Sequence, residues 1–200
     1  MQGILDSTAQ PMHLLRSQTH TLQTRGQAMG QLIYSMIVSL DGYVADKQGN
    51  FDWAMPDEDV LAVVNAETAT VGTYLYGRRM YQMMTVWETD PAMAEDSPGS
   101  RKYAKLWQQA HKVVYSTQLS EVETARTELR RQFDPLEVQQ LKESSSTDIS
   151  IDGPTLAAEA FRHDLIDRIH LVVCPVVVGG GLPFLPQIRM QLELLEHQSF

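Results

Sequence analysis

The 200-residue sequence holds a single cysteine, Cys174, so no disulfide can form within the chain. A chain without disulfides is typical of the reducing cytoplasm, where we expect it to reside. No apolar run reaches the roughly 18 residues that a membrane-spanning helix needs. The six histidines show neither H-x-H nor H-E-x-x-H spacing, so the sequence gives no support for a metal site.

Basic charge is also scarce, because 16 Lys and Arg face 25 Asp and Glu and leave a formal net charge of −9. An acidic chain of this kind argues against a nucleic-acid partner. Any basic residues that do cluster are therefore expected to serve a small anionic ligand. The hydrophobic share of 43% and the charged share of 20% are typical of an ordinary globular domain.

Residues 1–28 differ from the rest, since they are rich in Gln, Thr and Ser and show no sustained hydrophobic period. They also lack an apolar stretch of the length that a secretory signal requires. We expect a disordered or poorly docked extension there, followed by one domain over residues 29–200.

Strand-like and helix-like patterns alternate along residues 29–200. A brief strand is expected at Tyr43-Val44, and longer strands at 32–40, 71–77, 112–117, 148–151, 168–178 and 191–200. Helices are expected from about Pro56, and over 78–87, 100–110, 135–142 and from Pro154. The apolar runs 32–40 and 168–178 are typical of strands buried on both faces. This alternation predicts a single α/β domain with a mostly parallel central sheet between two helical layers.

Three of the expected strand ends carry residues that suit an anion. They are Gly77-Arg78-Arg79, Ser116-Thr117 and Gly153. The carboxyl ends of parallel strands meet at one edge of a sheet, where the N-termini of helices present free N–H groups. Each segment by itself is compatible with plain surface, but the three together favour a nucleotide with more than one phosphate.

The acidic run 57–59 has two readings. It either places negative charge at a helix N-terminus, where the helix dipole favours it, or it supplies a carboxyl that holds the N–H groups of a heterocycle and helps to protonate it. The residue types alone leave both open.

Five segments together resemble the dihydrofolate reductase-like superfamily, most of all stand-alone proteins similar to the reductase domain of bacterial riboflavin biosynthesis. The resemblance covers about residues 32–200 and rests on SLDGYVAD, GRRMY, VVYST, DGPTLAAEAFRHDLIDRIHL and PVVVGGGLPFLP. It implies an NADPH-dependent reductase of a small nitrogen heterocycle, most like 5-amino-6-(5-phosphoribosylamino)uracil reductase. A dihydrofolate reductase and a nucleotide-binding relative without catalysis are the alternatives, and a homodimer is left open.

The resemblance also implies roles for individual residues. The nicotinamide is expected to pass Ser39, Leu40, Asp41 and Gly42, and the cofactor phosphates to meet Gly77, Arg78 and Arg79. The 2′-phosphate is expected at Ser116 and Thr117 and the pyrophosphate at Gly153, with further cofactor contacts at Ile151, Pro154 and Thr155. The catalytic acid corresponds to Glu58, or to Asp57 if the register slips by one residue.

The sequence departs from the family pattern at three places. Asp152 stands where relatives usually have the first glycine of a pair, so we expect a carboxylate beside a phosphate site. Met80 replaces a common threonine. The sequence also stops at Phe200, where relatives carry one more strand, so the expected strand 191–200 would form an unpaired edge.

Overall fold

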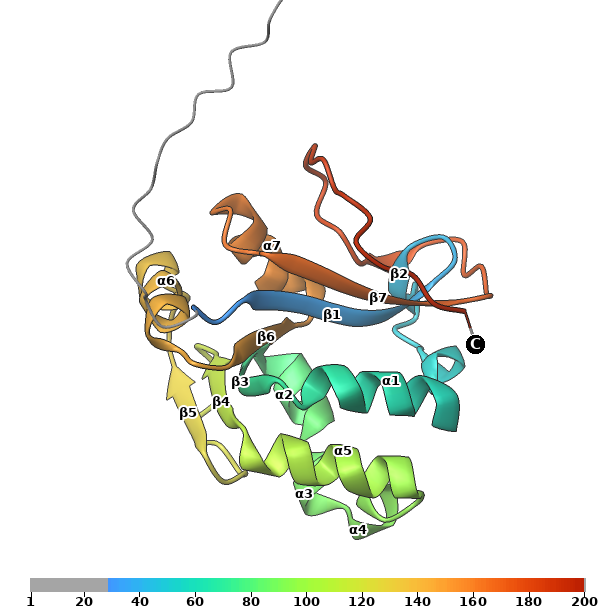
Figure 1. Ribbon diagram of the computed structural model, residues 1–200, viewed down its shortest axis with the longest axis horizontal. Coiled ribbons are helices and arrows are strands. Elements are labelled where there is room, and N and C mark those ends of the chain that lie inside the picture. Colours follow the sequence, from blue (N-terminus) through green and yellow to red (C-terminus); the bar gives the residue numbers. More distant parts are fainter. Residues whose placement is uncertain (1–28, 200) are drawn as a thin grey trace, which may run out of the picture.

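A computed structural model describes residues 29–199, and the expectations for residues 1–28 and for Phe200 lie outside it (Figure 1). Its main feature is a six-stranded sheet in the order β5-β4-β3-β6-β1-β7, in which every pairing is parallel. The strands are β1 Leu32–Ser39, β3 Val71–Gly77, β4 His111–Tyr115, β5 Thr127–Arg130, β6 Asp148–Asp152 and β7 Arg168–Cys174. A separate antiparallel pair joins β2 Tyr43–Asp46 to β8 Gly181–Pro183.

Helices cover both faces of the sheet and make three layers. One face carries α6 and α7, the other α2 and α5, with α1 packed beside α5 (Figure 1). The bounds are α1 Glu58–Thr68, α2 Arg78–Met84, α3 Val86–Thr89, α4 Pro91–Ala94, α5 Pro98–Gln109, α6 Pro135–Ser144 and α7 Pro154–Arg162, with a 3-10 turn at Asp52–Ala54. The predicted α/β architecture is confirmed. Among the helices in residues 29–199, none is long and apolar enough to cross a membrane.

Each face of the sheet has its own hydrophobic core. On the α6–α7 face, Tyr34 stacks on Phe184 with ring centroids 4.5 Å apart, and its hydroxyl donates to the Phe184 carbonyl at 2.9 Å. On the α2–α5 face, the Trp107 ring nitrogen donates to the Tyr76 hydroxyl at 2.9 Å. Buried Tyr and Trp are satisfied in this way because their polar atoms need partners inside a core.

Two strand predictions need correction on the main sheet. The short strand β5 escaped prediction, because its sequence TELR holds one apolar residue and carries no hydrophobic run. The predicted strand 168–178 ends at Cys174 and forms a sheet edge, so Leu171 and Val173 are about half exposed rather than buried. A continuous apolar run therefore marked an edge strand here, contrary to the usual reading.

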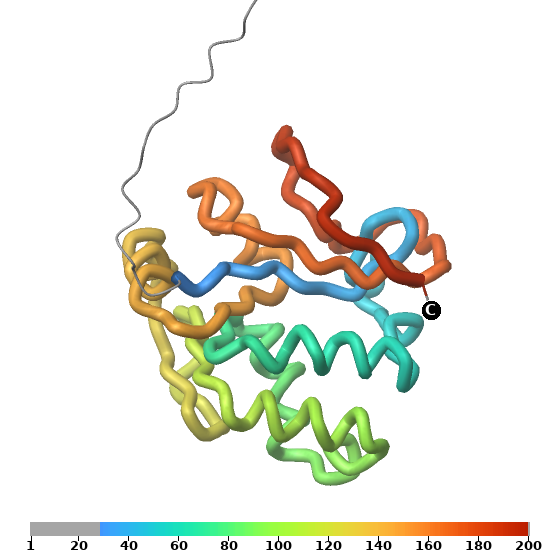
Figure 2. Tube along the Cα trace, in the orientation of Figure 1, coloured from blue at the N-terminus to red at the C-terminus, as the bar shows by residue number. Residues whose placement is uncertain are grey.

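The helix predicted from Pro56 begins later, at Glu58, and Asp57 is its N-cap residue. The predicted strand 191–200 is wrong over its described part, because residues 190–199 form no strand and Leu192, Leu194 and Leu195 are each more than 60% exposed. Figure 2 shows this segment running from the tip of the preceding loop down toward the chain end. Alternation alone makes no strand when no neighbouring backbone supplies hydrogen bonds.

Candidate functional site

The carboxyl ends of β3 and β6 form a crevice in the sheet. The two strands are neighbours, with Tyr76 opposite Asp152, yet the helices that follow them lie on opposite faces, α2 after β3 and α7 after β6. Open α/β sheets bind ligands at such a divergence point. Gly77 and Gly153 are the residues that end the two strands and open the two helices.

A cleft of about 2010 Å³ runs along this edge and between α1 and the sheet. That volume exceeds the roughly 300–1,000 Å³ of a single small-molecule pocket, so it has room for two ligands side by side. Its wall is largely apolar and includes Met55, Met80, Met83, Trp87 and Tyr103. The size and the apolar wall suit a dinucleotide beside a flat ring.

The predicted arginines lie on the rim of this cleft, Arg78 half-buried and Arg79 exposed. The Arg78 guanidinium donates to the Gln82 amide oxygen at 3.3 Å. No carboxylate of residues 29–199 forms an ion pair with either arginine. Both positive charges therefore remain available to an anionic ligand.

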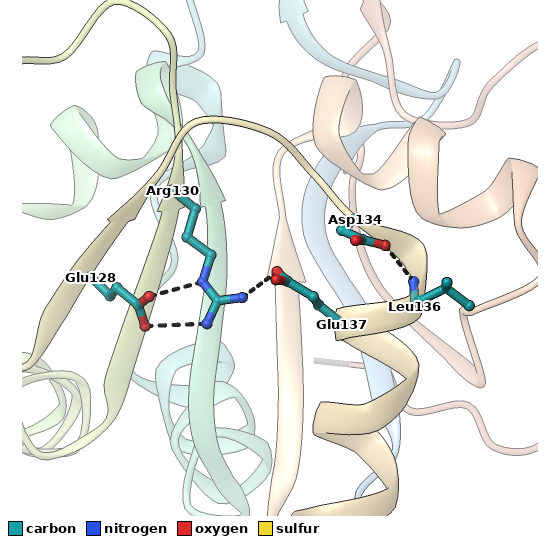
Figure 3. A network of polar contacts seen from close by, with 5 residues as sticks. All are labelled: Glu128, Arg130, Asp134, Leu136 and Glu137. Carbon is teal, nitrogen blue, oxygen red and sulfur yellow. Dashed lines mark hydrogen bonds and ion pairs between the residues drawn. The ribbon is translucent and has the colours of Figure 1, made fainter.

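Arg130 shows the opposite arrangement (Figure 3). Its guanidinium contacts Glu128, at 3.0 Å from Nε to Oε1, and also pairs with Glu137 of α6. Asp134 caps the same helix by accepting from the Leu136 amide at 2.9 Å. Two carboxylates neutralise Arg130, so this arginine links β5 to α6 instead of facing a ligand.

The other side of the crevice is built on Gly153, whose φ of +95° disfavours any side chain. An added Cβ would meet the Met80 side chain at 3.4 Å. Gly153 is the N-cap of α7 and gives no side-chain cap, so the first amides of that helix stay free. Pro154 and Thr155 follow in the first turn and line the cleft.

The polar side chains of the turn 39–42 form hydrogen bonds within the protein. The Ser39 hydroxyl accepts from the Tyr43 amide at 3.0 Å, and the Asp41 carboxylate accepts from the amides of Val178 and Gly179 at 3.1 and 2.8 Å. Burial raises the pKa of Asp41, but the Ser39 hydroxyl and the two amides outweigh it and lower that pKa overall. Leu40 is exposed, and Gly42 has a φ of +84°. None of the four predicted residues of this turn lines the cleft.

Three further predicted residues also lie outside the cleft lining. Ser116 is buried, and its hydroxyl accepts from the amides of Gln118 and Leu119 at 3.1 and 3.0 Å. Thr117 beside it is exposed, while Ile151 is fully buried in the α6–α7 core. The Arg131 guanidinium, which the sequence did not single out, donates to the Ser116 carbonyl at 3.1 Å.

Both predicted acids line the cleft near the start of α1. The Asp57 carboxylate accepts from the Val60 amide at 2.9 Å, so the helix-capping reading is observed for this residue. Glu58 is exposed, and its carboxylate lies over Gly99, where an added Cβ would meet it at 3.1 Å. A catalytic role for either acid stays a prediction.

Tyr74, Ser150 and Asp152 form the polar floor of the cleft, and of these three the sequence singled out only Asp152. The Ser150 hydroxyl donates to the Asp152 carboxylate at 2.7 Å, and the buried Tyr74 hydroxyl has no hydrogen-bond partner among the residues described. Burial raises the pKa of Asp152 to about 7, against the lowering effect of the Ser150 and Tyr76 hydroxyls. Strand alternation in DISID, which sends residues 150 and 152 to one face, was the available signal.

A second polar pair lies further along the cleft, where His170 Nδ1 is 3.0 Å from Glu67 Oε2. Within the part of the chain described, no three His, Cys, Asp or Glu side chains are arranged to hold a metal ion.

The sequence is similar to a known protein family and to a protein of Bacillus subtilis. The family model described as RibD C-terminal domain matches residues 31–200. The protein named "Uncharacterized protein YyaP" from Bacillus subtilis (strain 168) is 26% identical over 167 residues, which cover 82% of this chain and 85% of that protein.

Solved structures share the fold. A "Putative riboflavin biosynthesis protein" from Shewanella sp. PV-4 matches with a TM-score of 0.59 and 24% identity over 82% of this chain and 87% of its own. RibD from Acinetobacter baumannii matches with a TM-score of 0.55 and 16% identity over 86% of this chain and 52% of its own. Dihydrofolate reductase from Enterococcus faecalis, complexed with NADP(H), matches with a TM-score of 0.51 and 14% identity over 82% of this chain and 80% of its own. The dihydrofolate reductase-like fold is thereby confirmed.

Proposed function

This chain belongs to the RibD C-terminal domain family, whose members are NADPH-dependent reductases, and on that premise we propose that it reduces a small nitrogen heterocycle with NADPH. The substrate we favour is 5-amino-6-(5-phosphoribosylamino)uracil. Residues 29–200 form the cofactor-binding domain in this proposal.

The observation that carries the proposal is the crevice between β3 and β6, with Gly153 on one side and, on the other, two arginines that form no ion pair within residues 29–199. The free amides at the start of α7 suit a pyrophosphate. The arginine side chains suit the 2′-phosphate that distinguishes NADPH from NADH. The residues present therefore fit the cofactor, which when bound supplies a hydride.

The substrate ring lies along the α1 side of the cleft in this proposal. Trp87, Tyr103 and the methionine side chains offer apolar surface to a flat ring. Glu58 at the mouth offers a carboxylate to its N–H groups. The turn 39–42 and Ser116-Thr117 approach the cofactor only if their loops shift, because their polar groups are engaged within the protein.

The test is a pair of measurements on the full chain. Titration of protein fluorescence with NADPH and NADH should give clearly tighter binding of NADPH. NADPH oxidation should then be followed with 5-amino-6-(5-phosphoribosylamino)uracil, with a pterin and with dihydrofolate. Turnover of dihydrofolate alone would support a dihydrofolate reductase instead, and tight NADPH binding with no turnover would support a non-catalytic relative.

A further inference from the structure

A buried carboxyl group without a cation lies in the floor of the cleft. Asp152 is 6% exposed and lines the cleft from the end of β6. Its Oδ1 accepts from the Ser150 hydroxyl at 2.7 Å, and the Tyr76 hydroxyl also acts on the carboxyl as a hydrogen-bond donor. Ser150 thus holds one oxygen in place, and the carboxyl lines the cleft where a ligand can reach it.

Within residues 29–199, the groups that act on Asp152 from its own face of the sheet are neutral hydroxyls. Tyr74 and Tyr76 come from β3 and Tyr103 from α5, and each interacts electrostatically with the carboxyl. Tyr34 of β1 interacts with it from the opposite face of the sheet. Burial raises the pKa of every one of these tyrosines, so they stay uncharged at neutral pH. A buried carboxylate without a cationic partner is costly, and such a group keeps its proton instead.

Asp57 and Glu58, the two acids that the sequence predicted for the site, are placed differently. The Asp57 carboxylate is occupied in capping α1, where it accepts from the Val60 amide. Glu58 is exposed at the mouth of the cleft. Asp152 is also the acid nearest the crevice, because it directly precedes Gly153.

We propose that Asp152, oriented by Ser150, is the acid that protonates the heterocycle during its reduction. The assignment rests on the proposed function. In the favoured substrate the C=N bond is the imine that forms when the ribosylamino group opens, and hydride addition to its carbon moves the π electron pair onto the nitrogen. That nitrogen takes the proton from Asp152 Oδ2, whose O–H bond breaks. The Ser150 and Tyr76 hydroxyls stabilise the carboxylate that is left, and solvent returns the proton through the cleft.

The unpartnered hydroxyl of Tyr74 completes the floor. Tyr74 lies opposite Ser150 on the neighbouring strand, and its hydroxyl is buried without a hydrogen bond within the described residues. Buried polar atoms are normally satisfied. A polar ring atom of the substrate supplies the missing partner in this arrangement and fixes the ring above Asp152.

The experiment compares D152N and S150A with the control D148N, an equal change at the other end of β6, where Asp148 accepts from the Gln31 amide. Carboxyl carbon NMR of the labelled full chain follows the titration of Asp152, with D152N identifying its signal. We expect a midpoint near 7, a higher midpoint in S150A because the carboxylate loses a donor, and no change in D148N. A midpoint near 4 would overturn the assignment whatever the protein reduces.

Single-turnover reduction of 5-amino-6-(5-phosphoribosylamino)uracil by NADPH gives the second readout. The wild-type rate should be level below about pH 7 and fall roughly tenfold per unit above it, as the carboxyl loses its proton. D152N should be slower by about 100-fold or more, without this break, and should bind NADPH as the wild type does. An unchanged pH profile in D152N, or an equal loss of NADPH binding, would refute the assignment. A wild type that binds NADPH but reduces no heterocycle would overturn the proposed function, and the assignment with it.

Discussion

Removal of the two rim arginines gives the sharpest test of the cofactor site. A hydrogen bond to a charged group contributes about 1.5–3 kcal/mol when the site is shielded from water. Arg78 is half-buried and Arg79 is exposed, so Arg78 belongs toward the upper end of this range and Arg79 at the lower end. We expect Arg79→Ala to weaken NADPH binding about 10-fold and Arg78→Ala by up to roughly 150-fold.

The effect should fall on binding and not on folding. Neither arginine pairs with a carboxylate of residues 29–199, so alanine leaves no buried partner behind. Each variant should therefore unfold at the wild-type temperature. Arg101→Ala is the control, since Arg101 lies outside the cleft lining with Glu95 at 3.8 Å and should leave NADPH affinity unchanged.

Fluorescence titration with both cofactors reports the result, and NADH affinity should change much less than NADPH affinity in the more sensitive variant. Raising the salt concentration should weaken NADPH binding to the wild type more than to Arg78→Ala. The reason is that salt screens the attraction of the Arg78 charge for NADPH, which the variant lacks. Equal affinities of the wild type for the two cofactors would refute the reasoning. A larger loss of NADPH affinity in Arg79→Ala than in Arg78→Ala would show that the burial of the two arginines does not determine which contributes more to binding.

Three further changes probe the acid, the glycine and the buried ion pair. Glu58→Gln should lower turnover and leave NADPH affinity unchanged, since Glu58 lies at the α1 side of the cleft; a parallel loss of cofactor binding would mark it as structural. Gly153→Ala should reduce the free energy of unfolding by about 1–3 kcal/mol in urea titration, because its φ is +95°; an unchanged value would contradict this. Lys142→Met should lower the free energy of unfolding by about 2–3 kcal/mol, near the lower end for a broken buried pair. The reason is that Lys142 Nζ lies 2.7 Å from the partly exposed Asp167 carboxylate. Lys102→Met, which replaces an exposed lysine, is its control.

Local patterns in the sequence were sufficient for most of the fold. Apolar runs that end in glycine or a turn marked β1, β3 and β4, since a strand buried in a parallel sheet needs apolar side chains on both faces. The alternating segment DISID before a turn marked β6. Asp134-Pro135 marked the start of α6 through capping, which depends on neighbouring residues alone. The same reasoning failed for β5, whose strand exists only because β4 offers it hydrogen bonds.

The candidate site divides in the same way. The sequence by itself determined that Gly77, the arginine pair and Gly153 follow strands, and a parallel sheet then brings them to one edge. Only the tertiary structure decided that Arg78 and Arg79 stay unpaired while Arg130 is neutralised by Glu128 and Glu137. It also decided that Asp152 is buried among tyrosines. Charge and protonation depend on which side chains meet across strands and helices, and contacts between residues distant in the chain leave no local pattern.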